Sequence, residues 1–148
     1  MSKSNTFEND ILALIFNNTD IADIGDAGGL QNSATAGDLY IALHTADPTD
    51  AGTAASNETS YTNYDRVAVP RSGAGWTVSG NSATNFAQIT FPQCGASGAT
   101  ITHVSITTGG TPTTADKILY SGALNSSLAV ALNITPLFAA GGLTVTED

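Results

Sequence analysis

Leu39-Tyr40-Ile41-Ala42-Leu43-His44 is the clearest strand of this sequence. Side chains alternate between the two faces of a strand, so Leu39, Ile41 and Leu43 share one face. The opposite face is also mostly apolar, up to His44. A strand that is apolar on both faces is covered on both, so we expect it in the centre of a sheet.

Downstream of this strand, short apolar runs alternate with turns rich in glycine. The runs are Arg66–Val69, Trp76–Ser79, Phe86–Phe91, Ile101–Thr107, Ile118–Leu124, Leu128–Ile134 and Leu143–Thr146. Strands at this spacing without helices between them are typical of antiparallel sandwiches and barrels. The predicted fold class is therefore mainly β: an antiparallel β-sandwich or jelly-roll-like single domain, residues 1–148, with one N-terminal α-helix and a β-rich body over residues 66–148.

The N-terminal helix is expected over residues 5–18, within an arm of residues 1–18. Its apolar stripe follows helical spacing and consists of Phe7, Ile11, Leu14 and Ile15. Thr6 is the expected N-cap, and Asn17-Asn18 ends the helix. Such a stripe packs either on its own domain or on a neighbouring subunit, and the pattern leaves both open.

Residues 19–65 contain a glycine-containing loop (19–38), the central strand and a long polar connection (45–65). Long connections without regular structure are often functional, so we expect residues 45–65 to form an arm that reaches over an adjacent subunit. Aromatic side chains concentrate binding energy at interfaces. The partner-interface candidates are Phe7, Ile11, Tyr61, Tyr64, Arg66 and Trp76, and for Trp76 a place in the core weighs more.

The charge balance excludes several partners. Only 11% of the 148 residues are charged, and thirteen acidic residues face four basic ones, for a net charge of −9. Nucleic acids and anionic membranes bind through lysine and arginine, so neither is an expected partner. The chain shows no signal-peptide pattern and no apolar stretch long enough to span a membrane, so we expect it to be made in a cytoplasm and to stay soluble there.

The candidate chemical groups do not form a recognisable active site. His44 and His103 each lie in a strand without metal-ligand spacing, and Asp20, Asp23 and Asp26 do not follow the spacing of a calcium loop. Cys94 is the only cysteine, which predicts a buried small side chain and no intrachain disulfide.

No nucleophile elbow or phosphate loop occurs, and residues 66–146 contain one acid, Asp116. We therefore expect no enzyme activity, no cofactor and no metal.

Two stretches carry a resemblance to a known family. They are Gly37–Gly52, which includes LYIALHTADP, and the C-terminal part from Leu119 to Thr146; Tyr64–Val69, Ile89–Pro92 and Thr102–Val104 fall in the same order. The sequence resembles small structural proteins of tailed phages and prophages that are often called tail fibre proteins, and it is also similar to capsid-associated decoration proteins. The resemblance implies a virion component with a β-sandwich-like body and supplies no catalytic residues.

The leading functional prediction is a capsid decoration (cement) protein that binds the major capsid protein or other virion subunits as a homo-oligomer, with a trimer as the expected state. Subunits that bind only the expanded shell stabilise it by mass action. The alternative is a tail-associated protein, at a fibre or tail tip, that contacts the host. A carbohydrate-binding module or hydrolase of the same fold class is a third reading, because one β fold hosts unrelated functions.

Overall fold

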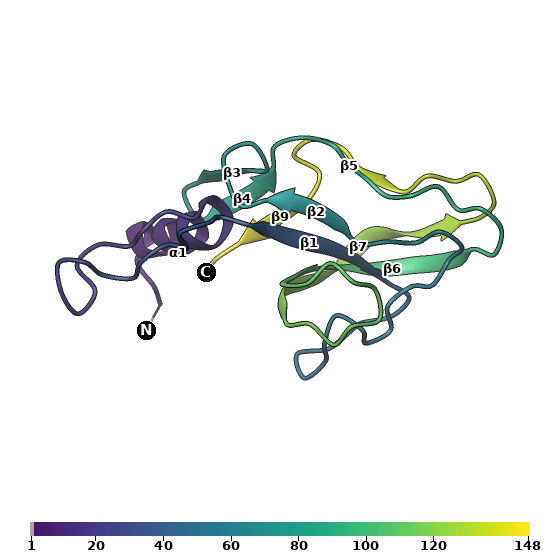
Figure 1. Ribbon diagram of the computed structural model, residues 1–148, viewed down its shortest axis with the longest axis horizontal. Helices are drawn as coiled ribbons and strands as arrows, with labels where there is room; N and C mark the ends of the chain where they lie inside the picture. Colours follow the sequence, from purple (N-terminus) through teal and green to yellow (C-terminus); the bar gives the residue numbers. More distant parts are fainter. Residues whose placement is uncertain (1) are drawn as a thin grey trace. The chain divides into compact units, whose positions relative to one another are not determined.

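The computed structural model describes residues 2–148 (Figure 1). Within this range the elements are α1 (Asn5–Asn17), β1 (Asp38–His44), β2 (Val67–Pro70), β3 (Trp76–Ser79), β4 (Ser82–Asn85), β5 (Ile89–Thr90), β6 (Ala99–Thr107), β7 (Ile118–Val130), β8 (Leu137–Phe138) and β9 (Thr144–Thr146). One helix and antiparallel strand pairs confirm the predicted fold class, a mainly β chain with an N-terminal α-helix, for these residues.

The contacts divide the chain into two compact units. The first contains the chain up to Asp38 together with residues 70–89 and 138–148, and the second contains residues 39–69 and 90–137. A single domain over residues 1–148 stays a prediction. Each unit has its own sheet, and we describe the two separately.

Helix α1 begins two residues earlier than a Thr6 cap would place it. The Ser4 hydroxyl accepts a hydrogen bond from the Phe7 N–H, so Ser4 is the N-cap, and Thr6 lies inside the helix. The helix ends at Asn18, which adopts a left-handed conformation with φ of 54°. Asparagine tolerates this conformation, and its N–H donates to the Ala13 carbonyl, which satisfies one free acceptor of the last turn.

The buried face of α1 differs from the predicted stripe. Leu12 and Phe16 are completely buried and Glu8 nearly so, whereas Phe7 is 37% exposed. Ile11, Leu14 and Ile15 are half-buried. The face that packs most closely on the domain is set by the large Phe16 ring, which lies on the same side as Leu12 one turn earlier.

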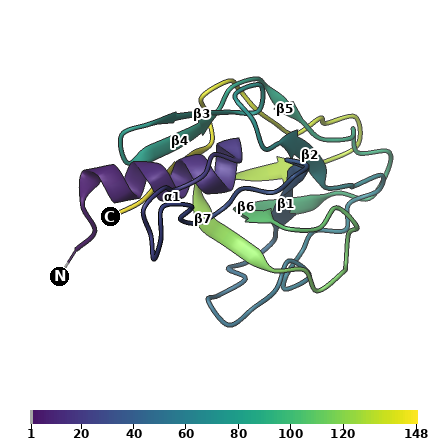
Figure 2. The ribbon, with the colours of Figure 1, turned by 60° about the vertical axis from the view of Figure 1, so that its left-hand side comes forward.

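In the first unit, α1 packs on the hairpin of β3 and β4 (Figure 2). The rings of Phe16 and Trp76 meet edge to face with centroids 4.6 Å apart. The Asn9 amide donates to the Gly80 carbonyl at 3.0 Å, at the turn of the hairpin. Strand β4 pairs with both β3 and β9, which completes a three-stranded sheet.

The second sheet has the order β2-β1-β6-β7, so β1 lies between two other strands. Strand β1 pairs antiparallel with β6, from Tyr40 opposite Thr107 to His44 opposite His103. Every residue of β1 from Ile41 to His44 is buried. The predicted central strand is confirmed, because only a strand flanked on both edges and covered on both faces has this burial.

Strands β6 and β7 also pair antiparallel, but their register shifts in the middle. Ile101 lies opposite Leu128 and His103 lies opposite Ala123, so residues 124–127 of β7 bulge opposite the single residue Thr102. The sequence predicted two strands separated at residues 125–127. The separation is real, but it is a bulge within one strand, and residues 131–134 do not continue that strand.

Other strand boundaries differ from the expectation. The predicted strand 86–91 is reduced to β5, and Phe86 is 59% exposed in the loop before it. Strand β4 was not predicted, because Ser82-Ala83-Thr84-Asn85 is short and mostly polar. Its strand conformation comes from pairing with β3 and β9, which no local pattern reveals.

Exchange of single side chains on α1 tests which of its faces is buried. Leu12→Ala should lower the free energy of unfolding by about 2–5 kcal/mol, because it leaves a cavity in the core. Phe7→Ala, the control, should cost about 1 kcal/mol or less, since this ring is partly exposed. Urea denaturation followed by circular dichroism measures both changes, and equal costs would contradict the orientation of the helix.

Candidate functional site

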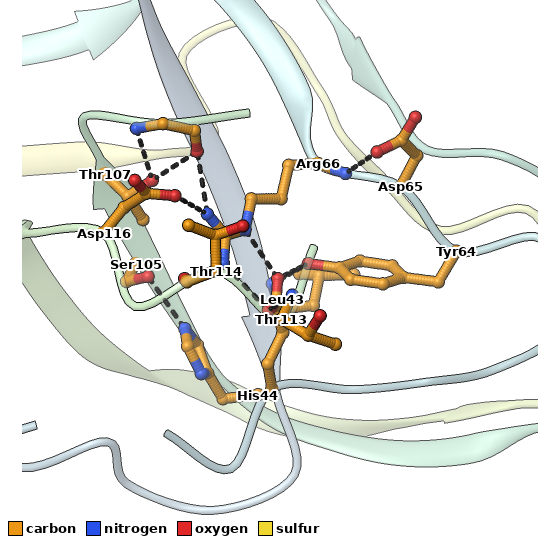
Figure 3. A network of polar contacts seen from close by, with 12 residues as sticks. Leu43, His44, Tyr64, Asp65, Arg66, Ser105, Thr107, Thr113, Thr114 and Asp116 are labelled. Carbon is orange, nitrogen blue, oxygen red and sulfur yellow. Dashed lines mark hydrogen bonds and ion pairs between the residues drawn. The ribbon is translucent and has the colours of Figure 1, made fainter. Parts of the chain in front are cut away.

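A buried arginine organises the long loops of the second unit (Figure 3). Arg66 immediately precedes β2, and its side chain is completely buried. Its Nη1 donates to Asp116 Oδ2 at 2.7 Å and to the Gly109 carbonyl at 2.8 Å, and its Nη2 donates to the Thr114 carbonyl at 3.0 Å. Arg66 therefore holds the loop between β6 and β7 at three points.

Glu58 accepts the remaining donors of the same guanidinium. Arg66 Nε lies 2.7 Å from Oε1 and Nη2 lies 2.9 Å from Oε2, a bidentate pair that uses the planar geometry of both groups. The Tyr64 hydroxyl donates to Oε1 at 2.9 Å, and the Thr113 N–H donates to Oε2 at 2.8 Å. All five guanidinium donors and both carboxylate oxygens of Glu58 are thus satisfied, as a buried ion pair requires.

The electrostatics follow from this geometry. Burial alone lowers the pKa of the Arg66 guanidinium, but hydrogen bonds and charges from Glu58 and Asp116 outweigh it and raise the pKa above its usual value. Burial, with the nearby Glu58 charge, also raises the pKa of the Tyr64 hydroxyl. Arg66 therefore stays charged and Tyr64 stays a neutral donor at every physiological pH. We call the side chains of Arg66, Glu58, Asp116 and Tyr64 the Arg66 network.

The polar connection 45–65 is folded back onto the unit and is not a free arm. The Thr59 N–H donates to the Leu43 carbonyl and the Ala54 N–H to the Asp116 carbonyl, each at 2.9 Å. Glu58, near the end of this connection, forms a buried ion pair with Arg66. The expectation that residues 45–65 reach over an adjacent subunit does not fit these bonds, since the extended state would leave the buried guanidinium without Glu58.

Three of the predicted interface residues are buried. Tyr61 is 2% exposed and donates its hydroxyl to the Pro92 carbonyl, and Arg66 belongs to the network above. Trp76 is completely buried against Phe16, which agrees with the core reading of this residue. None of the three is available as a surface anchor in this conformation.

The other three predicted interface residues are partly accessible but do not form one group. Tyr64 is half-buried, with its ring stacked on Phe91, whereas Phe7 and Ile11 belong to α1 in the other unit. Burial of the hydroxyl raises the pKa of Tyr61 to about 12. Sequence reasoning selected aromatic residues for their size, and size draws a ring into a core as readily as into an interface.

His44 has a hydrogen-bond pattern that resembles the start of a catalytic dyad. Its Nε2 lies 2.7 Å from the Ser105 hydroxyl, and its Nδ1 lies 2.9 Å from the Ser56 carbonyl, which can orient the ring. His44 is completely buried and Ser105 is 1% exposed. A substrate carbonyl could not approach this hydroxyl, so the pair satisfies polar groups in the core.

Two of the three candidate carboxylates in the 19–38 loop have local structural partners. Asp20 accepts from the Asn32 N–H, and Asp26 accepts from the N–H groups of Gly28 and Gly29, so both carboxylates stabilise the 19–38 loop. Between residues 2 and 148, no three His, Cys, Asp or Glu side chains are grouped closely enough to hold a metal ion. Cys94 is completely buried, as the sequence predicted.

One cationic contact was missed by sequence reasoning. Arg71 lies outside α1, yet its Nε donates to the Ile15 carbonyl and its Nη2 to the Leu14 carbonyl, both at 2.7 Å. These carbonyls belong to the last turn of the helix, where a positive charge is stabilising. The contact spans 56 residues of sequence, so no local pattern could have indicated it.

The exposed surface also carries apolar side chains that the sequence analysis did not select. In the second unit they are Leu128, Leu132, Ile134 and Leu137, of which Leu132 is 57% exposed. They lie within ten consecutive residues of the chain. An exposed apolar group of this kind is typical of an interaction surface.

The comparisons with known proteins agree with an assembly component. The family model described as Podophage GP4 fiber I protein gp80 matches residues 2–146. The chain belongs to this family. The expected membership of a phage virion structural family is thereby confirmed, over nearly the whole chain. No curated protein matches.

The Arg66 network holds the loops of the second unit from inside, and the four exposed apolar side chains lie on the surface of that unit. Among the helices of the described residues, none is long and apolar enough to cross a membrane.

Removal of the Arg66 charge tests the network in this fibre-family protein. Arg66→Met should lower the free energy of unfolding by roughly 3–5 kcal/mol, because it leaves Glu58 and Asp116 without their buried partner. Lys3→Met, which breaks the more exposed ion pair with Glu147, should cost about 1 kcal/mol or less. The combination Arg66→Met with Glu58→Gln should cost less than the sum of the two single changes, and additivity would contradict the coupling.

His44 predicts a dependence of stability on pH. Burial lowers the pKa of its imidazole below the ordinary value of 6.5, against a smaller opposing effect of Ser56 and Glu58, and Arg66 and His103 lower it further. As the pH falls, His44 therefore takes up a proton in the unfolded chain at a higher pH than in the folded one. The stabilisation of the fold by neutral, buried His44 is complete above pH 6.5 and is lost as the pH falls through the pKa of the folded state.

The stability difference between the wild type and His44→Gln isolates this contribution. It should shrink between pH 7.5 and pH 5.5 in urea denaturation, since only the wild type has the imidazole to protonate. A difference that stays constant over this range would contradict the assignment.

Proposed function

We propose that this protein is a structural subunit of a phage fibre that acts by binding other virion subunits and not by catalysis. The observation that carries the proposal is the match of the fibre family model to residues 2–146. The match includes the N-terminal helix and the C-terminal strands, so it is not confined to one segment. A virion location follows from a fibre role.

The interior of the second unit supports a structural role. The Arg66 network joins the 45–65 connection, β2 and the β6–β7 loop in one set of short hydrogen bonds. Bonds of this kind between charged groups are about twice as strong as neutral ones. They favour rigid loops, which suit a permanent contact better than a mobile lid.

The surface gives little support to glycan binding or hydrolysis. Sugar-binding sites commonly present exposed tryptophan or tyrosine rings, yet the single tryptophan and Tyr61 are buried, and the other three tyrosines are half-buried. The only serine–histidine pair identified above is closed to substrate. These features favour the structural role over a carbohydrate-binding module or hydrolase.

Capsid decoration, with the major capsid protein as partner, remains the second candidate. The favouring observation is the absence of internal repeats in a chain of 148 residues, since fibre shafts are commonly long and repetitive. A small subunit that binds only the expanded shell would stabilise it by mass action. The family description favours the fibre, so we place decoration second.

Copy number and position in the purified particle distinguish the two locations. A fibre subunit should be present in a handful of copies, and gold-labelled antibodies should mark the tail or fibres in electron micrographs. A decoration protein should approach one copy for each major capsid protein and should label the shell. Near-equal copy number with shell labelling would overturn the fibre proposal.

A further inference from the structure

Two threonines have a backbone conformation that threonine rarely adopts. Thr49 has a φ of 63° and Thr113 a φ of 65°, both in the left-handed region. The branched side chain of threonine crowds the backbone there, so a β-branched residue at such a φ is an outlier. The other left-handed residues besides glycine between residues 2 and 148 are all asparagine or aspartate, which tolerate this conformation: Asn18, Asp23, Asn57, Asn63 and Asn133.

Both threonines follow a proline. Residues 111–114 form a turn that is closed by a hydrogen bond from the Thr114 N–H to the Thr111 carbonyl, with Pro112 and Thr113 between them. Proline in the second position and a positive φ in the third are the signature of a type II turn, which normally has glycine in the third position. Pro48 precedes Thr49 in the same way. Glycine would therefore fit the backbone of both positions with less strain.

Packing and hydrogen bonding do not account for the two threonine side chains. Both residues are exposed, so neither fills the core. Each donates its backbone N–H at 2.8 Å, Thr49 to Asp47 Oδ1 and Thr113 to Glu58 Oε2. Glycine has the same N–H and would make the same bonds. Strain of this kind is concentrated at functional sites, where the side chain is used for something other than folding.

The two threonines lie on loops that are fastened to each other. The Ala54 N–H donates to the Asp116 carbonyl at 2.9 Å, and Arg66 donates both to Glu58 in the 45–65 connection and to the Thr114 carbonyl in the β6–β7 loop. Figures 1 and 2 show these loops side by side in the second unit. Loops that are fixed before a partner arrives lose little conformational entropy on binding, so they suit a specific contact.

We call the exposed residues of segments 45–51 and 111–115 the loop surface. Its charge indicates the kind of partner that it fits. The 45–65 connection has no Lys or Arg and has four acidic residues, which are Asp47, Asp50, Glu58 and Asp65. Glu58 is paired with Arg66, and the other three are exposed. Lys117, beyond the second segment, offsets one of these charges. A basic protein surface would be attracted here, whereas a second copy of this chain, with its net charge of −9, would be repelled.

We propose that the loop surface binds a different virion subunit that is basic at the contact, with Thr49 and Thr113 as contact residues and Asp50 facing a cationic side chain. The strained turns present the hydroxyl and methyl group of each threonine to this partner. The inference rests on the proposed function, because it names the surface through which a virion protein would be held in the particle.

Replacement of each threonine by glycine separates folding from binding. Thr49→Gly and Thr113→Gly should unfold at the same or a higher urea concentration than the wild type, because glycine relieves the backbone strain. Both variants should nevertheless enter the particle less well, because a contact side chain is lost. A purely structural role of the threonines would not move the two measurements in this way.

Incorporation is measured by competition. Cells that make the wild type and one variant in equal amounts are infected with a phage that lacks its own copy of the gene, and intact-mass spectrometry gives the ratio of the two chains in purified particles and in the cell extract. Each glycine variant should be depleted in the particle by about fivefold, the affinity that one contact residue commonly contributes. Asp23→Gly is the control, since it places glycine at an exposed left-handed position of the other unit and should be incorporated like the wild type.

Incorporation of Thr49→Gly and Thr113→Gly at the wild-type level, or a fall in their urea midpoint, would overturn the proposal. The purified variants should also keep the mass of the wild type in sedimentation equilibrium. A change in that mass would place the threonines between copies of this chain and would likewise overturn it.

Reversal of one charge tests whether the partner is basic. Asp50→Lys should be depleted in the same competition by at least about fivefold, because two cations would then meet at the contact. Asp23→Lys makes the same change of net charge on an exposed residue of the other unit and should be incorporated like the wild type. Wild-type or better incorporation of Asp50→Lys would exclude a basic partner at this surface.

The experiments separate this inference from the proposed function. Absence of the wild-type chain from purified particles would contradict the proposed function itself. Presence of the wild type together with undiminished incorporation of the loop variants would contradict the loop surface alone.

Discussion

The bidentate ion pair between Arg66 and Glu58 is the constraint on which the loops of the second unit depend. Taking two charges out of water costs several kcal/mol, and only complete hydrogen bonding offsets that cost. The chain meets the condition by bringing Asp116, Tyr64 and three backbone groups to the same place. Two long connections that are polar in sequence therefore have defined conformations, which explains why residues 45–65 are packed and not extended.

A second arginine has a comparable role in the first unit. Arg71 binds the last carbonyls of α1, while the hairpin of β3 and β4 receives Phe16 and thereby orients the helix. Half of the four basic residues are thus engaged with the interior or with backbone groups. Since most acidic residues stay exposed, the surface is more one-sided in charge than the composition alone suggests. This makes the uncharged segment from β7 onwards distinctive.

Family membership and the structure both support a structural function. The fibre family places the chain in a virion, where proteins act through lasting contacts. The structure adds loops held by buried hydrogen bonds, a buried histidine–serine pair and a segment, residues 118–146, without charged side chains. These features support the structural role that we propose.

The sequence by itself determined the class of the fold, the N-terminal helix, the central position of β1 and the interruption of β7. Each of these depends on local periodicity or on turn residues, which are visible along the chain. Tertiary structure alone decided the buried face of α1, the existence of β4 and the partners of Arg66 and Arg71. These depend on groups tens of residues apart, and a side chain suited to an interface is equally suited to a core until its neighbours are known. For that reason Tyr61 and Arg66 were predicted at a surface and are buried, whereas Trp76 is in the core, the position favoured for it.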